Sequence, residues 1–76
     1  MNKTSPVYIT PVKKGKEEKF KEFLTQELNI EDSRIQSELF KLNKDFYIFH
    51  IDLSDKNDKD FGEIRKDLNA NQLLYL

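Results

Sequence analysis

Residues 33–54 read SRIQSELFKLNKDFYIFHIDLS, and this stretch decides the predicted fold. Its second half, FYIFHIDL, is rich in aromatic and β-branched residues, as β-strands are. Between the two halves lie Asn43, Lys44 and Asp45, which tolerate a tight turn. We therefore predict an antiparallel hairpin with strands at 34–42 and 46–53.

The length of the hairpin loop sets the predicted register. A two-residue loop would shift the pairing by one residue and invert the faces of one strand. A three-residue loop at 43–45 keeps the apolar residues of each face together, so we predict this loop. The predicted pairs are Leu42–Phe46, Phe40–Ile48, Glu38–His50, Leu39–Phe49 and Ile35–Leu53.

The segments around the hairpin predict one further strand and helix on each side. VYITPV (7–12) reads as a strand that ends near Pro11, and residues 16–28 carry apolar side chains at helical spacing. After the hairpin, residues 60–69 read as a helix and residues 72–76 as a short strand. The order β-α-β-β-α-β is that of the ferredoxin-like fold, with four antiparallel strands and both helices on one face. We predict an α+β fold in a single domain over 1–76, although residues 70–76 also fit an extension of the second helix.

Composition excludes several classes of function. Thirteen Lys and Arg against fourteen Asp and Glu give a net charge of −1, without the basic excess of a nucleic-acid binder. The chain has no cysteine and one histidine, so thiolate zinc sites and metal motifs with two histidines are excluded. The acidic loop around Asp55, Asp58 and Asp60 lacks the glycine of an EF-hand. We therefore expect no cofactor, no metal and no nucleic-acid partner.

The sequence also bears on location. No apolar run is long enough to span a bilayer, and MNKTSPVYIT lacks the apolar core of a signal peptide. We therefore expect a cytoplasmic protein without a membrane partner.

One face of the predicted sheet has no helix to cover it. On that face we expect the apolar interface residues Phe40, Leu42, Phe46 and Ile48. Soluble domains rarely leave such a patch in water, and a second copy is its commonest cover. We therefore predict a homodimer through this face, with another protein as the other candidate partner.

The segment VYITPVKKGKEEKFKEFL (7–24) resembles the dimeric α/β-barrel superfamily, typified by antibiotic-biosynthesis-monooxygenase domains. Members share a strand, a Lys-Glu-Glu helix start and an amphipathic helix with aromatic spacing. The resemblance implies a face-to-face homodimer whose two sheets close into a barrel. Some members are cofactor-independent oxygenases, so the resemblance also implies this activity as an alternative.

His50 and Glu38 are the candidate catalytic residues if the protein is an enzyme. As a pair they would form an acid/base couple inside the barrel, while the simpler reading is a structural cross-strand pair.

A third reading places Tyr8, Phe40 and Phe46 on the uncovered face as a base-stacking platform, but the matching RNA-binding motif is absent. The favoured function is a small non-catalytic binding or interaction module that associates through the helix-free face as a homodimer. A regulator or inhibitor of another protein is a further role that such a domain suits. The alternative is a cofactor-independent oxygenase or isomerase acting on a small metabolite.

Overall fold

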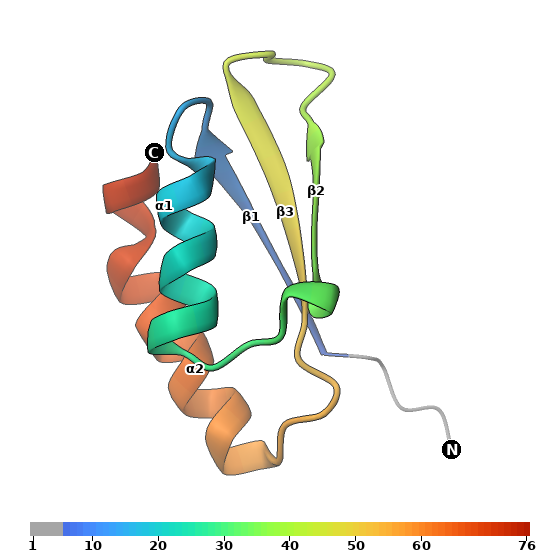
Figure 1. Cartoon of the computed structure of the whole chain (residues 1–76), viewed down its shortest axis with the longest axis vertical. Helices are drawn as coiled ribbons and strands as arrows, with labels where there is room; N and C mark the ends of the chain where they lie inside the picture. Colours follow the sequence, from blue (N-terminus) through green and yellow to red (C-terminus); the bar gives the residue numbers. More distant parts are fainter. Residues whose placement is uncertain (1–5) are drawn as a thin grey trace.

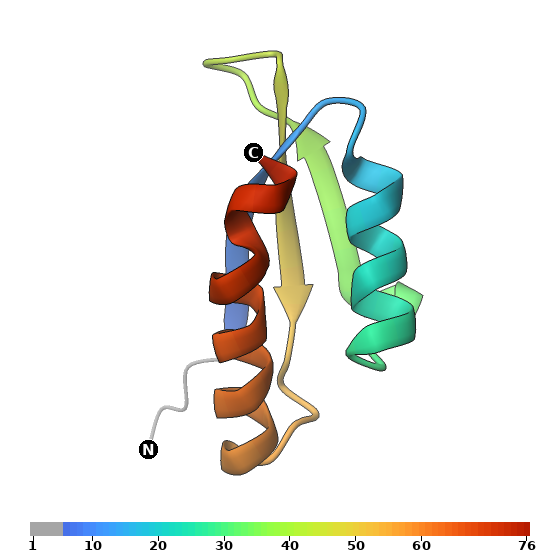
Figure 2. The same cartoon turned by 90° about the vertical axis from the view of Figure 1, so that its left-hand side faces the viewer.

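The computed structural model describes residues 6–76 as a three-stranded antiparallel sheet with helices packed on one face (Figure 1). The strands are β1 (Val7–Lys13), β2 (Ile35–Leu39) and β3 (Phe46–Asp52), in the order β1-β3-β2. The helical elements are α1 (Glu17–Glu22) with its continuation η1 (Phe23–Glu27), the single turn η2 (Asp32–Arg34), and α2 (Asp58–Asn71) with its continuation η3 (Gln72–Tyr75). A view turned by 90° shows α1 and α2 side by side over the same face of the sheet (Figure 2).

The predicted four-stranded sheet is wrong, because residues 72–76 do not form a strand. Instead, α2 continues directly into the single 3-10 turn η3. No glycine or proline separates the two, so nothing breaks the helical path. The ring of Tyr75 then lies 4.9 Å from that of Phe20 and adds to the core under α1. The broader α+β class holds, but the ferredoxin-like β-α-β-β-α-β order does not.

The helix α2 begins at Asp58, two residues earlier than predicted. Its N-cap is Asn57, whose side-chain Oδ1 accepts a 2.8 Å hydrogen bond from the N–H of Asp60. The cap fixes the start of α2, and Ile64 and Leu68 then face the sheet. The sequence pattern had placed the start at Asp60, which in the structure is a first-turn residue.

The hairpin register differs from the predicted one by two residues. Phe40 donates its N–H to the carbonyl of Phe46 at 3.0 Å, so the loop spans 41–45 instead of 43–45. Asn43 shapes this loop, because its side chain accepts from the N–H of Asp45 at 3.0 Å and its carbonyl from that of Phe46 at 3.1 Å. Glu38 therefore lies opposite Ile48, and Gln36 lies opposite His50. A shift of two residues leaves every side chain on its predicted face of the sheet.

The edge strand β1 runs through Pro11 to Lys13 instead of ending at the proline. Lys14 donates its N–H to Asp45, and Leu53 donates to Pro6, so the even-numbered residues of β1 bond to β3. Pro11 therefore points its missing N–H outward, the position an edge strand tolerates. The same alternation turns Tyr8, Thr10 and Val12 toward the helices.

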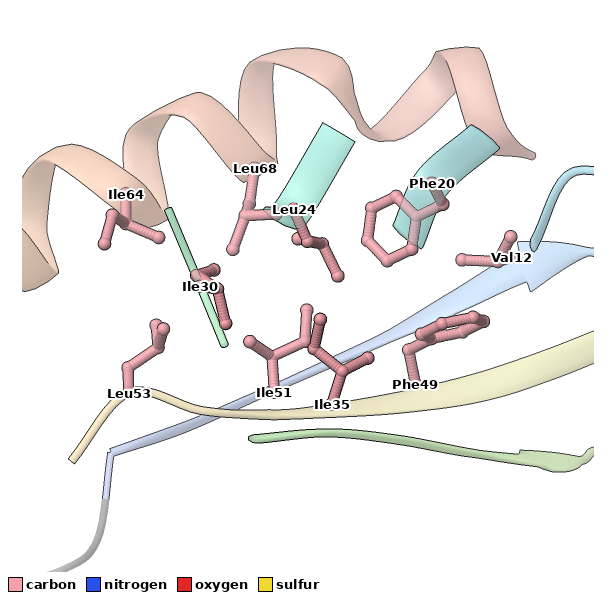
Figure 3. Close-up of a cluster of buried hydrophobic side chains, with 10 residues drawn as sticks. All are labelled: Val12, Phe20, Leu24, Ile30, Ile35, Phe49, Ile51, Leu53, Ile64 and Leu68. Carbon is pink, nitrogen blue, oxygen red and sulfur yellow. The ribbon is translucent and has the colours of Figure 1, made fainter. Parts of the chain in front are cut away.

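The core lies between the sheet and the helices (Figure 3). The fully buried side chains from both layers include Phe49 and Ile51 of β3 and Leu24 of η1. Tyr8 extends this layer and donates its hydroxyl to Asn69 Oδ1 of α2 at 2.6 Å. The buried hydrophobic residues are Val12, Phe20, Leu24, Ile30, Ile35, Phe49, Ile51, Leu53, Ile64 and Leu68. Within residues 6–76, no helix covers the opposite face of the sheet.

Candidate functional site

We call the helix-free side of the sheet the open face. Across it, the register sets Ile9 of β1 and Gln36 of β2 on either side of His50 in β3. Ile9 is 59% exposed and Val7 is 44% exposed, although both are β-branched apolar residues at strand positions. The side chains of the open face are Val7, Ile9, Pro11, Lys13, Gln36, Glu38, Phe40, Phe46, Ile48, His50 and Asp52.

Three of the four residues predicted for the interface lie together on the open face. Phe40, Phe46 and Ile48 are half-buried there, and Lys13 Nζ lies 5.2 Å from the centre of the Phe46 ring. Leu42 lies instead in the hairpin loop, where it is 87% exposed. All four remain predicted contact residues.

The sequence did not reveal the contribution of β1 to the open face. The base-stacking hypothesis put Tyr8 on this face, which would have turned Val7 and Ile9 inward. The structure shows the reverse, with Tyr8 packed against the core. Apolar residues of VYITPV fall on both faces of the strand, Val7 and Ile9 on one and Val12 on the other, so this pattern alone does not choose which face lies in the core.

His50 and Glu38 lie close to each other, although not directly opposite. His50 Nε2 is 3.6 Å from Glu38 Oε2, a diagonal contact between neighbouring rows of the ladder. The histidine side chain is 38% exposed and the glutamate side chain 70% exposed. The two residues thus meet as predicted, but in a solvated setting where such a pair contributes little to stability.

Two grooves adjoin this pair on the open face. One has a volume of about 620 Å³ and is lined by Val7, Arg34, Gln36, Glu38, His50 and Asp52, among others. The other, of about 390 Å³, is lined by Leu39, Phe40 and Ile48 and shares Glu38 and His50 with the first. The volume beside His50 is large enough for a small ligand.

Arg34 joins the strand ends at one edge of the larger groove. Its guanidinium lies 3.3 Å from Asp52, 3.5 Å from Asp55 and 3.7 Å from Glu31. Within residues 6–76, the buried Nε of Arg34 has no hydrogen-bond partner, so it interacts with Glu31 and Asp55 through charge, whereas Nη1 donates a hydrogen bond to Asp52. The cluster holds the loop after β3 against the start of β2.

Asp52 has a carboxyl group whose affinity for protons is reduced by its neighbours. The hydroxyl and the N–H of Ser54 hold the pKa of Asp52 below its ordinary value, and Arg34 acts in the same direction. The Ser54 N–H donates to Asp52 Oδ1 at 2.9 Å, and Arg34 Nη1 donates to Oδ2 at 3.3 Å. These contacts favour the charged form of the carboxyl group.

We expect Asp52→Asn to lower the free energy of unfolding at neutral pH and to have a smaller effect in acid. Because the folded-state pKa is depressed, the carboxylate stabilises the fold above its unfolded-state pKa of about 3.9. That stabilisation is lost as pH falls through the folded-state pKa. Urea denaturation of both proteins over this pH range measures the difference. Asp45→Asn, at an exposed loop aspartate, is the control. If Asp52→Asn lowers the free energy of unfolding by the same amount in acid as at neutral pH, the lowered pKa of Asp52 is contradicted.

Within residues 6–76, no group of three or more His, Cys, Asp or Glu side chains comes together in a way that suits a metal ion. Over the same residues, no helix combines the length and the apolar character needed to cross a bilayer.

Comparisons of the chain with protein-family models, curated proteins and solved structures give no match. The resemblance of residues 7–24 to the dimeric α/β-barrel superfamily therefore stays a prediction. The fold itself defines a coarser class. It is a small α+β domain with one sheet face covered by helices and the other left open.

Proposed function

We propose that the protein is a small non-catalytic interaction module that pairs with a second copy of itself through the open face. The observation that carries this proposal is the row of apolar side chains left uncovered there. Ile9, Phe46 and Ile48 come from neighbouring strands and form one continuous surface. Packing against another sheet would remove that surface from water, which is the main favourable term in association.

The charges at the two ends of the open face favour a second copy as the occupant. One end carries Lys13, with Lys41 in the adjoining loop, and the other carries Asp52 and Asp55 beside Arg34. Two copies packed face to face with antiparallel strands set the basic end of each against the acidic end of the other. A two-fold axis produces this arrangement with a single type of contact.

The proposal agrees with the face-to-face dimers of the dimeric α/β-barrel superfamily, and it keeps the cytoplasmic location predicted from the sequence. Because each sheet has three strands instead of four, the two paired sheets would be narrower than in a four-stranded domain. Another protein bound across the same face, which this chain would regulate or inhibit, is a competing outcome of the test.

Sedimentation velocity over a range of concentrations tests the proposal. We expect the sedimentation coefficient to rise from that of a monomer to that of a dimer by micromolar concentration. Added salt should weaken the dimer, because charges at the rim are screened. A chain that stays monomeric at high concentration would overturn the proposal.

The groove beside His50 favours a second candidate function, an acid/base enzyme of the oxygenase or isomerase type. Its distinguishing test is His50→Gln. We expect the variant to keep its fold and its self-association, because the His50–Glu38 contact is solvated. NMR of a mixture of small metabolites, incubated with each protein, checks for turnover. A metabolite consumed by the wild type and not by His50→Gln would replace the module with the enzyme.

A further inference from the structure

Three segments that are distant in the sequence meet at one end of the molecule. They are residues 13–19, residues 41–45 and residues 72–76, and we call this end the lysine pole. Lys14 donates its N–H to Asp45 at 2.7 Å, and Lys16 Nζ donates to the carbonyl of Leu74 at 3.3 Å. Figures 1 and 2 both show the C-terminus, the β1–α1 turn and the hairpin loop at the same end.

Charge is distributed unevenly along the length of the molecule. The lysine pole holds six lysines and three carboxylates, a net charge of +3. The opposite end, residues 27–34 and 52–63, holds eight carboxylates and three basic residues, a net charge of −5. The overall charge of −1 thus conceals a strong separation. A negatively charged partner is attracted to the lysine pole and repelled by the other end.

The lysine pole also carries the most exposed leucines of residues 6–76. Leu42 is 87% exposed, Leu73 82% and Leu74 64%. Leu73 and Leu74 lie in η3, next to Lys16. Neither groove of the open face reaches these two leucines. Side chains this exposed project from the surface instead of lining a hollow.

We propose that the lysine pole docks on an anionic lipid surface, with Leu73 and Leu74 entering the boundary between headgroups and acyl chains. Exposed aliphatic side chains beside lysines match the interfacial layer of an anionic membrane, where apolar groups are buried just below charged headgroups. The exposed lysines of the pole that the proposed dimer contact does not use then face the lipid phosphates and carboxylates; they are Lys14, Lys16, Lys19 and Lys44. Docking of this kind needs no membrane-spanning helix. It goes beyond the proposed function and reverses the prediction from the sequence that the protein has no membrane partner.

Co-sedimentation with vesicles tests the inference. We expect the chain to pellet with vesicles rich in phosphatidylserine, to stay in solution with pure phosphatidylcholine, and to be released at high salt. Leu73→Gln/Leu74→Gln should weaken binding by about tenfold or more, because the inserted apolar area is lost. Lys14→Gln/Lys44→Gln should do the same, since each lysine near an anionic surface contributes roughly fivefold.

Matched controls separate the lysine pole from overall charge and from the dimer. Lys59→Gln/Lys66→Gln makes the same change in net charge on the exposed side of α2, and it should leave binding unchanged. Ile48→Lys, which alters only the open face, should also keep vesicle binding, so failure of the proposed dimer leaves this inference standing. Circular dichroism checks that each variant is folded.

Three results would overturn the inference. These are no binding to anionic vesicles, equal binding to neutral vesicles, or an equal loss in the Lys59→Gln/Lys66→Gln control. Binding to polyglutamate without binding to vesicles would instead assign the lysine pole to an acidic protein.

Discussion

Phe49→Ala should remove a large fraction of the free energy of unfolding of this domain. Phe49 is 2% exposed at the centre of β3, and its ring meets that of Phe20 edge-on at 5.1 Å. Truncating a buried phenylalanine costs about 3–5 kcal/mol. A domain of this length has a total stability of about 4–11 kcal/mol, so the loss is a large fraction of the whole. Thermal and urea denaturation followed by circular dichroism should show a fall in Tm of at least about 12 °C.

Phe46→Ala is the matched control, since it removes the same side chain three residues away on the other face of β3. Phe46 is half-buried on the open face, where Lys13 lies over its ring. Its loss should cost the monomer about 1 kcal/mol and weaken self-association. Equal destabilisation by the two substitutions would mean that the two faces of the sheet are not distinguished as the structure describes.

Local patterns predicted most of the fold, and the errors at the end of α2 and in the hairpin loop arise where contacts that composition does not specify decide the structure. Residue periodicity within each segment predicts the three strands and the two helices. It does not predict the structure of residues 72–76, because QLLYL is short and apolar enough for a strand or a helix. The packing of Tyr75 against Phe20 decides between them, and that contact joins residues far apart in the sequence. The hairpin loop likewise depends on hydrogen bonds of Asn43, which turn-tolerant composition alone does not specify.

The candidate site was predicted where its residues lie on one hairpin and missed where a second strand joins it. Phe40, Phe46 and Ile48 share a face in any register shifted by an even number of residues, so the error of two residues did not separate them. His50 and Glu38 still meet because diagonal neighbours on a sheet are within reach of long side chains. The position of Ile9 beside His50 depends on the pairing of β1 with β3, two strands that α1 and β2 separate in the sequence. Periodicity within a strand carries no information about that pairing.

Ile48→Lys should convert the proposed dimer to a monomer. Ile48 lies at the middle of the open face, between Pro11 of β1 and Glu38 of β2. In the free chain the new ammonium lies opposite the Glu38 carboxylate, a favourable cross-strand pair, so the fold should persist. In the dimer the same charge would be buried against a second apolar sheet, which costs about 3–5 kcal/mol. The dissociation constant should therefore rise by at least about a hundredfold, as measured by sedimentation velocity.

Gln26→Lys is the control for this substitution, because it adds the same charge at an exposed position of η1 on the helix side. It should leave both the fold and the dimer unchanged. If Ile48→Lys still dimerises as tightly as the wild type, the contact between copies lies elsewhere, and the open face is not the interface.

If the wild type dimerises and circular dichroism shows that Ile48→Lys is unfolded, Ile9→Gln tests the same interface. That substitution removes an exposed apolar side chain from the same face without adding a charge. It should weaken the dimer while the thermal stability of the monomer stays within about 0.5 kcal/mol of the wild type.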